Sequence, residues 1–290
     1  MTITILDGGV GQELVKRGSA APTPLWSTRV MLEEPELVRA VHDEFFAAGA
    51  DIVTANSYSA HHDRLAAAGL DDQFEALHRA ACGLAGAARD AHGQGLIAGS
   101  LGPIGWSYRP EAAPPPEGAA PLYREIAALQ APLVDVLLCE TMSSVAQARG
   151  ALMGVSGAGK PVWLAISTAD DDGGRLRSGE PATEILPLLD AFEIDALLVN
   201  CTRPEAVTDT LALLQHCGAP LGAYANGFSR IAAAYRSSTA TVEELSARDD
   251  MTPERYADHA ERWAELGATI IGGCCEIGPA HIAAVKSRLC

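Results

Sequence analysis

Two neighbouring cysteines near the end of the chain are the residues best placed to do chemistry. Cys274 and Cys275 follow the apolar run 268–271 and the pair Gly272 and Gly273. The run predicts a strand, so both thiols would lie at a strand tip where glycines leave the backbone open to a ligand. Successive side chains of a regular strand point to opposite faces, so the glycines must let the chain turn before both sulfurs can bind one ion. The pattern is typical of a thiolate metal site.

A third ligand has to come from elsewhere, and Cys201 is the best candidate because it follows the apolar run 196–200. Three thiolates with an open fourth position suit a catalytic zinc ion better than a structural one, which four protein ligands would close. The alternative for all three is a buried, unreactive thiol, the usual state of a free cysteine. That alternative is the better interpretation for the cysteines in other contexts, which are Cys82, Cys139, Cys217 and Cys290.

The elements that must position these thiols are eight short apolar runs separated by amphipathic segments. Apolar residues recur at helical spacing between the runs, for example in 37–48 and 74–88. Eight such units without a break in composition predict an α/β fold, a single-domain (β/α)8 TIM barrel over residues 1–290. The expected strands cover residues 2–6, 52–55, 96–100, 134–139, 162–166, 196–199, 221–225 and 269–271. Helices are expected to begin at or near Pro204, Pro253 and Pro279.

A barrel of this kind carries its chemistry at the carboxyl ends of its strands. Polar residues follow the expected strands at these positions. They include Asp7, Asn56, Ser57, Glu140, Thr141, Ser167, Asn200 and Asn226, besides the three cysteines. Residues far apart in the sequence can therefore converge on one metal ion.

Charge and composition exclude several classes of partner. The net charge of -16 leaves no basic surface for nucleic acid or anionic lipid. The chain shows neither a signal peptide nor an apolar run long enough to span a membrane, so we expect a cytoplasmic protein. Seven cysteines in a chain of 290 residues, large enough to bury a core, favour reduced thiols over disulfides. The sequence does not indicate an oligomeric state.

Two connections are unusually long. The segment 102–121 is rich in proline, and we expect a semi-rigid wall in which Trp106 or Tyr108 faces a cationic group of a ligand. A brief helix is expected to follow at 122–131. The segment 226–251, after the seventh strand, is the second candidate for covering the site.

Taken together, the motifs resemble the homocysteine S-methyltransferase family. They occur in the family's order, as Asp7-Gly8-Gly9-Val10-Gly11, Thr54-Ala55-Asn56-Ser57-Tyr58, Gly99-Ser100-Leu101-Gly102-Pro103, Glu140-Thr141, Val199-Asn200-Cys201-Thr202 and Gly272-Gly273-Cys274-Cys275. The double cysteine with an upstream Asn-Cys pair is highly specific. The resemblance implies a zinc-dependent barrel enzyme in which Cys201, Cys274 and Cys275 bind Zn²⁺ and homocysteine's sulfur enters as another ligand. No catalytic residue beyond the zinc site is expected.

Resemblance and charge together assign the residues that bind homocysteine. Asp7 and Glu140 suit its ammonium group, and the backbone N–H groups of Gly8 and Gly9 suit its carboxylate. Asn226 would either fill the open zinc position before substrate arrives or turn the chain into the next loop. A small sulfonium donor, S-methylmethionine or S-adenosylmethionine, fits because transfer removes its positive charge and gives methionine. Candidates for cradling the donor cation are Tyr58, Trp106, Tyr108 and Tyr224.

Other functions use the same residues. Betaine is the nearest competing donor, and a related thiol or selenol is the nearest competing acceptor. A non-catalytic barrel that senses zinc or thiols would need the cysteines but not Asp7 or Glu140.

Three further motifs have simpler interpretations. His61 and His62 follow the second strand and are expected to be solvated, and His281 is expected to position the last loop. The run 90–95 matches the Asp-x-His-x-x-Gly pattern of cobalamin modules. Its position predicts a helix end before the third strand, so no cobalamin is implied.

Overall fold

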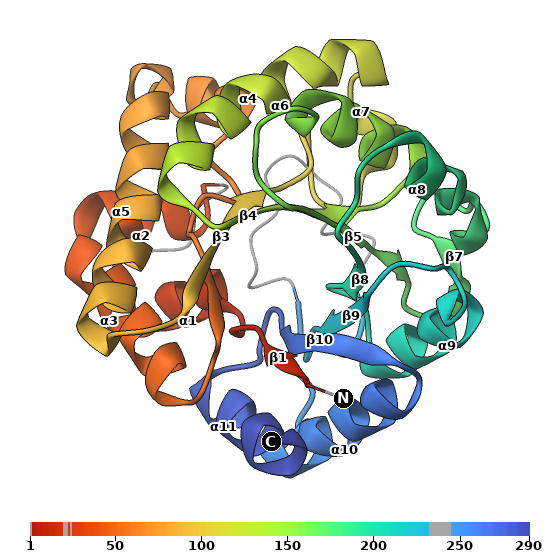
Figure 1. Ribbon diagram of the computed structural model, residues 1–290. Helices are drawn as coiled ribbons and strands as arrows, with labels where there is room; N and C mark the ends of the chain where they lie inside the picture. The colour runs from red at the N-terminus through yellow and green to blue at the C-terminus, as the bar shows by residue number, and fades with distance from the viewer. Residues whose placement is uncertain (1, 20–22, 24, 232–244) are drawn as a thin grey trace.

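The predicted (β/α)8 barrel is confirmed. The computed structural model describes residues 2–19, 23, 25–231 and 245–290. Eight parallel strands and one hairpin have these bounds: β1 Thr4–Ile5, β2 Ile52–Thr54, β3 Leu96–Leu101, β4 Val136–Met142, β5 Val162–Ile166, β6 Thr168–Ala169, β7 Asp172–Leu176, β8 Ala196–Asn200, β9 Leu221–Ala225 and β10 Ala268–Gly273. β1 pairs with β10, and a parallel bridge from Leu6 to Ile52 joins the first strand to the second. Figure 1 looks along the barrel and shows the strands inside and the helices outside.

Side chains alternate along each strand between the interior of the barrel and the surrounding helices. One cluster takes its members from around the whole ring: Leu6, Ile52, Ala98, Val136, Leu138, Trp163, Ala165, Ala196, Leu198, Tyr224 and Ile270. The alternate residues, such as Val53, Ile97 and Leu197, belong to a larger apolar cluster against the helices. Because both layers are apolar, polar side chains gather at the ends of the strands.

Helices cover the outer face of the ring (Figure 1). Their bounds are α1 Val10–Arg17, α2 Ser27–Glu33, α3 Pro35–Ala47, α4 His62–Ala67, α5 Phe74–His92, α6 Pro116–Gln130, α7 Val145–Val155, α8 Pro187–Ala191, α9 Pro204–Leu214, α10 Pro253–Glu265 and α11 Pro279–Leu289. As expected, Pro204, Pro253 and Pro279 begin helices, since a first-turn residue needs no N–H acceptor. Among the described helices, none is both long and apolar enough to cross a membrane.

Two elements differ from the expectation. α6 begins at Pro116 rather than near residue 122, and so includes the last part of the proline-rich segment. Proline suits a first helical turn, and Glu117 complements the positive end of the helix dipole. The sequence reasoning also missed the β6–β7 hairpin, which follows β5 and turns at Asp170 and Asp171.

Three aspartates join neighbouring strands at the amino ends of the barrel. Each directly precedes a strand, and one of its carboxylate oxygens accepts a backbone N–H of the adjacent strand. The pairs are Asp51 with Ile5, Asp135 with Ile97 and Asp195 with Val162, at 2.7 to 2.8 Å. These acids therefore hold the ring together at the end opposite the cysteines.

Candidate metal centre and substrate pocket

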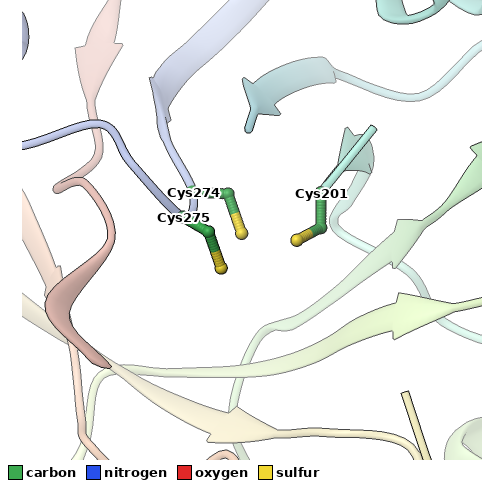
Figure 2. A group of neighbouring side chains, drawn as sticks. All are labelled: Cys201, Cys274 and Cys275. Carbon is green, nitrogen blue, oxygen red and sulfur yellow. The ribbon is translucent and has the colours of Figure 1, made fainter. Parts of the chain in front are cut away.

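Three cysteine sulfurs meet at the carboxyl end of the barrel. Cys201 directly follows β8, and Cys274 and Cys275 directly follow β10. Their Sγ atoms all lie within 4.8 Å of one another, and Figure 2 shows them around one space. Zinc–sulfur bonds of about 2.3 Å in a tetrahedral arrangement would place the sulfurs about 3.8 Å apart, so small rotations bring these thiols onto one ion. Thiolates are soft ligands, and this donor set fits zinc.

The backbone around the thiols is strained. In the part of the chain that the structure describes, the non-glycine residues with a positive φ, between 48° and 68°, are Trp26, Tyr108, Thr141, Cys201 and Glu276. The first four line one cavity, and the fifth directly follows Cys275. Left-handed backbone costs a side-chain-bearing residue on the order of 1 kcal/mol or more. Its concentration at one rim indicates a functional site.

Arg177 holds the loop that carries Cys201. Its Nη2 donates to the carbonyl oxygen of Cys201 at 3.0 Å, and it forms a buried ion pair with Asp170 at 3.0 Å. Its guanidinium lies 4.6 Å from the ring centre of Tyr108, whose hydroxyl is 2.9 Å from the Cys201 sulfur. Sequence reasoning missed both Arg177 and Asp170, although the turn-forming cluster 170–174 could have indicated the hairpin that supplies them.

The three thiols differ in acidity. The pKa of Cys201 lies well below its usual range, because the thiols of Cys274 and Cys275 hydrogen-bond to its sulfur and Tyr108 and Arg177 lie nearby. The same hydrogen bonds raise the pKa of Cys274 and of Cys275, since each thiol keeps its proton and donates it in a hydrogen bond to the Cys201 sulfur. The group thus accommodates one thiolate by itself, and a divalent cation would remove the repulsion that opposes the other two.

Asp7 and Glu140 are buried acids on the same rim. Asp7 accepts the backbone N–H of Thr54 at 2.6 Å and its hydroxyl at 2.9 Å. Glu140 accepts the hydroxyls of Ser100 and Tyr224. Burial raises the pKa of each carboxyl to about 7. A cationic group that enters the site favours their ionised forms.

Gly8 and Gly9 let the first loop pack against the last. A Cβ atom would lie 2.1 Å from the Ile277 carbonyl oxygen at Gly8, and 2.6 Å from the Cys274 carbonyl oxygen at Gly9. The close approach excludes any larger residue and brings Asp7 to the cysteines. The N–H of Gly9 already donates to the Ile277 carbonyl at 2.8 Å, so it has no proton left for a ligand. The Gly8 N–H has no acceptor among the described residues.

The two acids and the three thiols line one cavity. Its other walls include Arg64 and, among the aromatic residues, Trp26, Tyr58, Trp106, Tyr108, Tyr224 and Phe228. Phe228 and Leu245 come from the segment 226–251, so parts of both long connections line the cavity. Residues 232–244 of that segment lie outside the described residues.

Asn226 is buried just after β9 and is not among the residues that line the cavity. Its Oδ1 accepts the backbone N–H of Phe228 at 3.1 Å, which is the turn expected as one of its two roles. Its Nδ2 is buried with no hydrogen-bond partner in the described part of the chain.

A family model described as homocysteine S-methyltransferase matches residues 4–289. The chain belongs to the homocysteine S-methyltransferase family. It is 32% identical to a homocysteine S-methyltransferase of Escherichia coli strain K12, over 99% of this chain and 95% of that one. It is 30% identical to the homocysteine S-methyltransferase YbgG of Bacillus subtilis strain 168, covering 97% and 92% of the two chains. The metallated form of the Escherichia coli homocysteine methyltransferase MmuM superposes with a TM-score of 0.82 at 30% identity, over 99% and 96% of the chains.

Within this family member, the aromatic side chains of the proline-rich segment line the cavity as expected, but arginines lie over their rings. The guanidinium of Arg64 lies 5.2 Å from the ring centre of Trp106 and 5.9 Å from that of Tyr58. Arg177 occupies the corresponding place over Tyr108. These rings already contact a cation of the protein itself.

The three histidines singled out in the sequence lie in different environments. His61, directly before α4, is buried rather than solvated, whereas His62 is half-exposed and contacts Asp71 at 2.6 Å. His281 does position the last loop: Nδ1 accepts the N–H of Gly278, and Nε2 contacts the Met251 carbonyl at 3.0 Å.

The run 90–95 is a helix end, as expected. Gly93 adopts a left-handed conformation after α5, and β3 begins at Leu96.

Proposed function

We propose that the protein transfers a methyl group from a small sulfonium donor, S-methylmethionine or S-adenosylmethionine, to the thiol of L-homocysteine, and so makes methionine. One observation carries the proposal: three thiols that can share a metal ion meet two buried acids in one cavity. Family membership supports homocysteine as the acceptor. A barrel that only stored zinc or sensed thiols would have no use for the acids.

Each polar group of homocysteine has a partner in the cavity. Its ammonium group would lie between Asp7 and Glu140, whose raised pKa values fall as the cation binds and ionises them. Its carboxylate would accept the N–H of Gly8, which has no acceptor in the described chain. Asn226 remains a candidate substrate residue, because its buried Nδ2 lacks a partner among these residues and a buried donor without one is costly.

Cys201, Cys274 and Cys275 would hold the zinc ion and leave its fourth position to the acceptor. When bound, the ion supplies a Lewis acid that lowers the pKa of the acceptor thiol from its usual value of about 8.5, so that a nucleophilic thiolate is present at neutral pH. The chain keeps the ligands in place through the Arg177 contact with the Cys201 carbonyl. The Tyr108 hydroxyl lies close enough to donate to the Cys201 sulfur and so stabilise its negative charge.

The remaining task of the chain is positioning. Methyl transfer needs the attacking sulfur, the methyl carbon and the leaving sulfur in line, and the cavity walls limit how the two substrates can lie. The donor leaves as a neutral thioether, so no proton has to be given to the leaving group. The ionisable side chains near the thiols are therefore needed to bind the charged groups of the substrates and not to donate a proton.

Direct turnover tests the proposal. Purified zinc-loaded protein is incubated with L-homocysteine and, separately, S-methylmethionine, S-adenosylmethionine or betaine, and methionine is measured. Methionine from a sulfonium donor at a rate well above the enzyme-free mixture is expected. If only betaine gave methionine, homocysteine would stand as the acceptor and betaine would be the donor. If none of the three donors gave methionine, the proposal would be overturned.

A further inference from the structure

A buried arginine lines the cavity on the side formed by the loops after β2 and β3. Arg64 lies in α4, and only 6% of it is exposed. Together with Tyr58 and Trp106 it lines the cavity that contains the three thiols. No motif in the sequence indicated that Arg64 would be buried beside this cavity.

The charge of Arg64 has no carboxylate partner among the described residues. Its Nε donates to the Gly105 carbonyl at 3.2 Å and its Nη2 to the Pro103 carbonyl at 3.5 Å, and both acceptors are neutral. Its Nη1 has no hydrogen-bond partner in the same part of the chain. A guanidinium stays charged at any physiological pH, and burying it without a counter-ion is costly.

The other well-buried arginines do have acids. Arg177 pairs with Asp170, and Arg248 pairs with Glu205 and Asp250. Arg64 therefore differs from them in lacking an acidic partner, which a ligand anion would supply, because a carboxylate pairs well with a guanidinium fork.

The aromatic rings do not replace that counter-ion. The ring centres of Tyr58 and Trp106 lie 5.9 and 5.2 Å from the guanidinium, and a cation–π contact stabilises a cation much less than a paired carboxylate does. They also keep Arg64 beside the cavity, where it would repel the positive sulfur of a donor that approached it. This part of the cavity is suited to an anionic group.

We propose that Arg64 binds the carboxylate of the methyl donor, and that the enzyme therefore selects sulfonium donors that carry a carboxylate. The inference rests on the proposed function and adds the orientation of the donor. The carboxylate lies at Arg64, beside Tyr58 and Trp106, and the sulfonium lies toward the cysteines. The acids and the Gly8 N–H remain for homocysteine.

The test compares two donors in two proteins. Initial rates are measured for wild type and Arg64→Gln with S-methylmethionine and with its decarboxylated analogue, each at saturating homocysteine. For S-methylmethionine, Arg64→Gln should lower kcat/KM by about 30-fold or more, the effect of truncating one partner of a buried charge pair. For the decarboxylated analogue the substitution should leave kcat/KM unchanged or raise it, because the donor's charge is no longer repelled.

Controls separate this role from support of the loop. Arg79→Gln removes an arginine that is paired with Glu75 at the surface of α5, and should change neither donor's kinetics. Arg64→Lys keeps the charge and should fall between wild type and Arg64→Gln with S-methylmethionine. Zinc content and KM for homocysteine should match wild type in both Arg64 variants.

The outcomes are distinct. Equal loss with both donors would make Arg64 a support of the loop after β3, and a rise in KM for homocysteine alone would assign it to the acceptor's carboxylate. Either result overturns this inference while the proposed function stands. Failure of wild type to use any sulfonium donor overturns the proposed function and this inference with it.

Discussion

The two ends of the barrel use acidic residues for different purposes. At the amino ends of the strands, Asp51, Asp135 and Asp195 each accept a backbone N–H of a neighbouring strand and stay partly or largely exposed. At the carboxyl ends, Asp7 and Glu140 are 1% and 7% exposed and line the cavity of the cysteines. The same side-chain chemistry therefore supports the strands where water reaches it and, under the proposed function, binds the substrate's ammonium group where burial raises its pKa.

Backbone strain also differs between the two ends of the barrel. The described non-glycine residues with positive φ, Cys201 and Tyr108 among them, lie in or next to the cavity. The strands at the opposite end begin with regular pairing that the aspartates reinforce. The comparison predicts that substitutions at the cavity change chemistry and that substitutions at the amino ends change stability.

The largest effect is expected at the cysteines. Cys275→Ala removes one of three metal ligands, so zinc should fall from about one ion per chain to a small fraction of that, and methionine formation should fall to background. Elemental analysis and the turnover assay measure both. Cys217→Ala, outside the cavity, should keep both properties. Unchanged zinc in Cys275→Ala would refute the ligand assignment.

Glu140→Gln should weaken homocysteine binding without removing zinc. The substitution keeps the shape of the side chain but removes its charge, so KM for homocysteine should rise by roughly 10- to 100-fold, the size of a lost hydrogen bond between charged groups. Asp135→Asn, at the amino end, should leave KM unchanged. If Glu140→Gln has normal KM and kcat, the acid has no part in the recognition of homocysteine.

Binding at the cavity should depend on pH. Asp7 and Glu140 have pKa values raised to about 7, so both are largely neutral below that pH and must ionise to bind an ammonium group. The affinity for L-methionine, which has no thiol to titrate, should therefore fall by about tenfold per pH unit, or more, as pH decreases below about 7. Calorimetry between pH 5.5 and 7.5 measures it. The dependence should be shallower in Asp7→Asn, and a flat profile in wild type would contradict the raised values.

The smallest effect is expected at the amino ends. Asp195→Ala removes the acceptor of the Val162 N–H at an exposed position, so the free energy of unfolding should fall by about 1 kcal/mol. Urea unfolding measures the loss, and kcat/KM should stay at the wild-type value. A change in kcat/KM without a change in stability would contradict the claim that the amino ends of the strands serve stability alone.

The sequence was sufficient for the architecture, because each strand is a short apolar run with its own turn signals. The runs 162–166 and 221–225 were predicted with their observed bounds. The double cysteine after two glycines also led to the metal centre, since strand ends of a barrel converge whatever their distance along the chain. The start of α6 was predicted wrongly, because the apolar pattern placed it near residue 122 whereas the helix begins at Pro116, a residue that suits a first helical turn.

The arginines could not be found in this way. Arg64 and Arg177 act through burial, through the carbonyl groups they reach and through the presence or absence of a paired acid. None of these properties is visible in a single sequence, where both residues look like ordinary surface charges. His61 was misjudged for the same reason, because a position after a strand predicts exposure and only the folded structure shows its burial.

Cobalt substitution tests the central claim most directly, because it reports the metal site and the acceptor in one spectrum. Protein loaded with Co²⁺ in place of zinc should show sulfur-to-metal charge transfer from Cys201, Cys274 and Cys275. L-homocysteine should change that spectrum by adding a further sulfur ligand, and Glu140→Gln should require more homocysteine for the same change. A cobalt spectrum without thiolate character, or one that homocysteine leaves unaltered, would contradict a thiolate metal centre built to activate this acceptor.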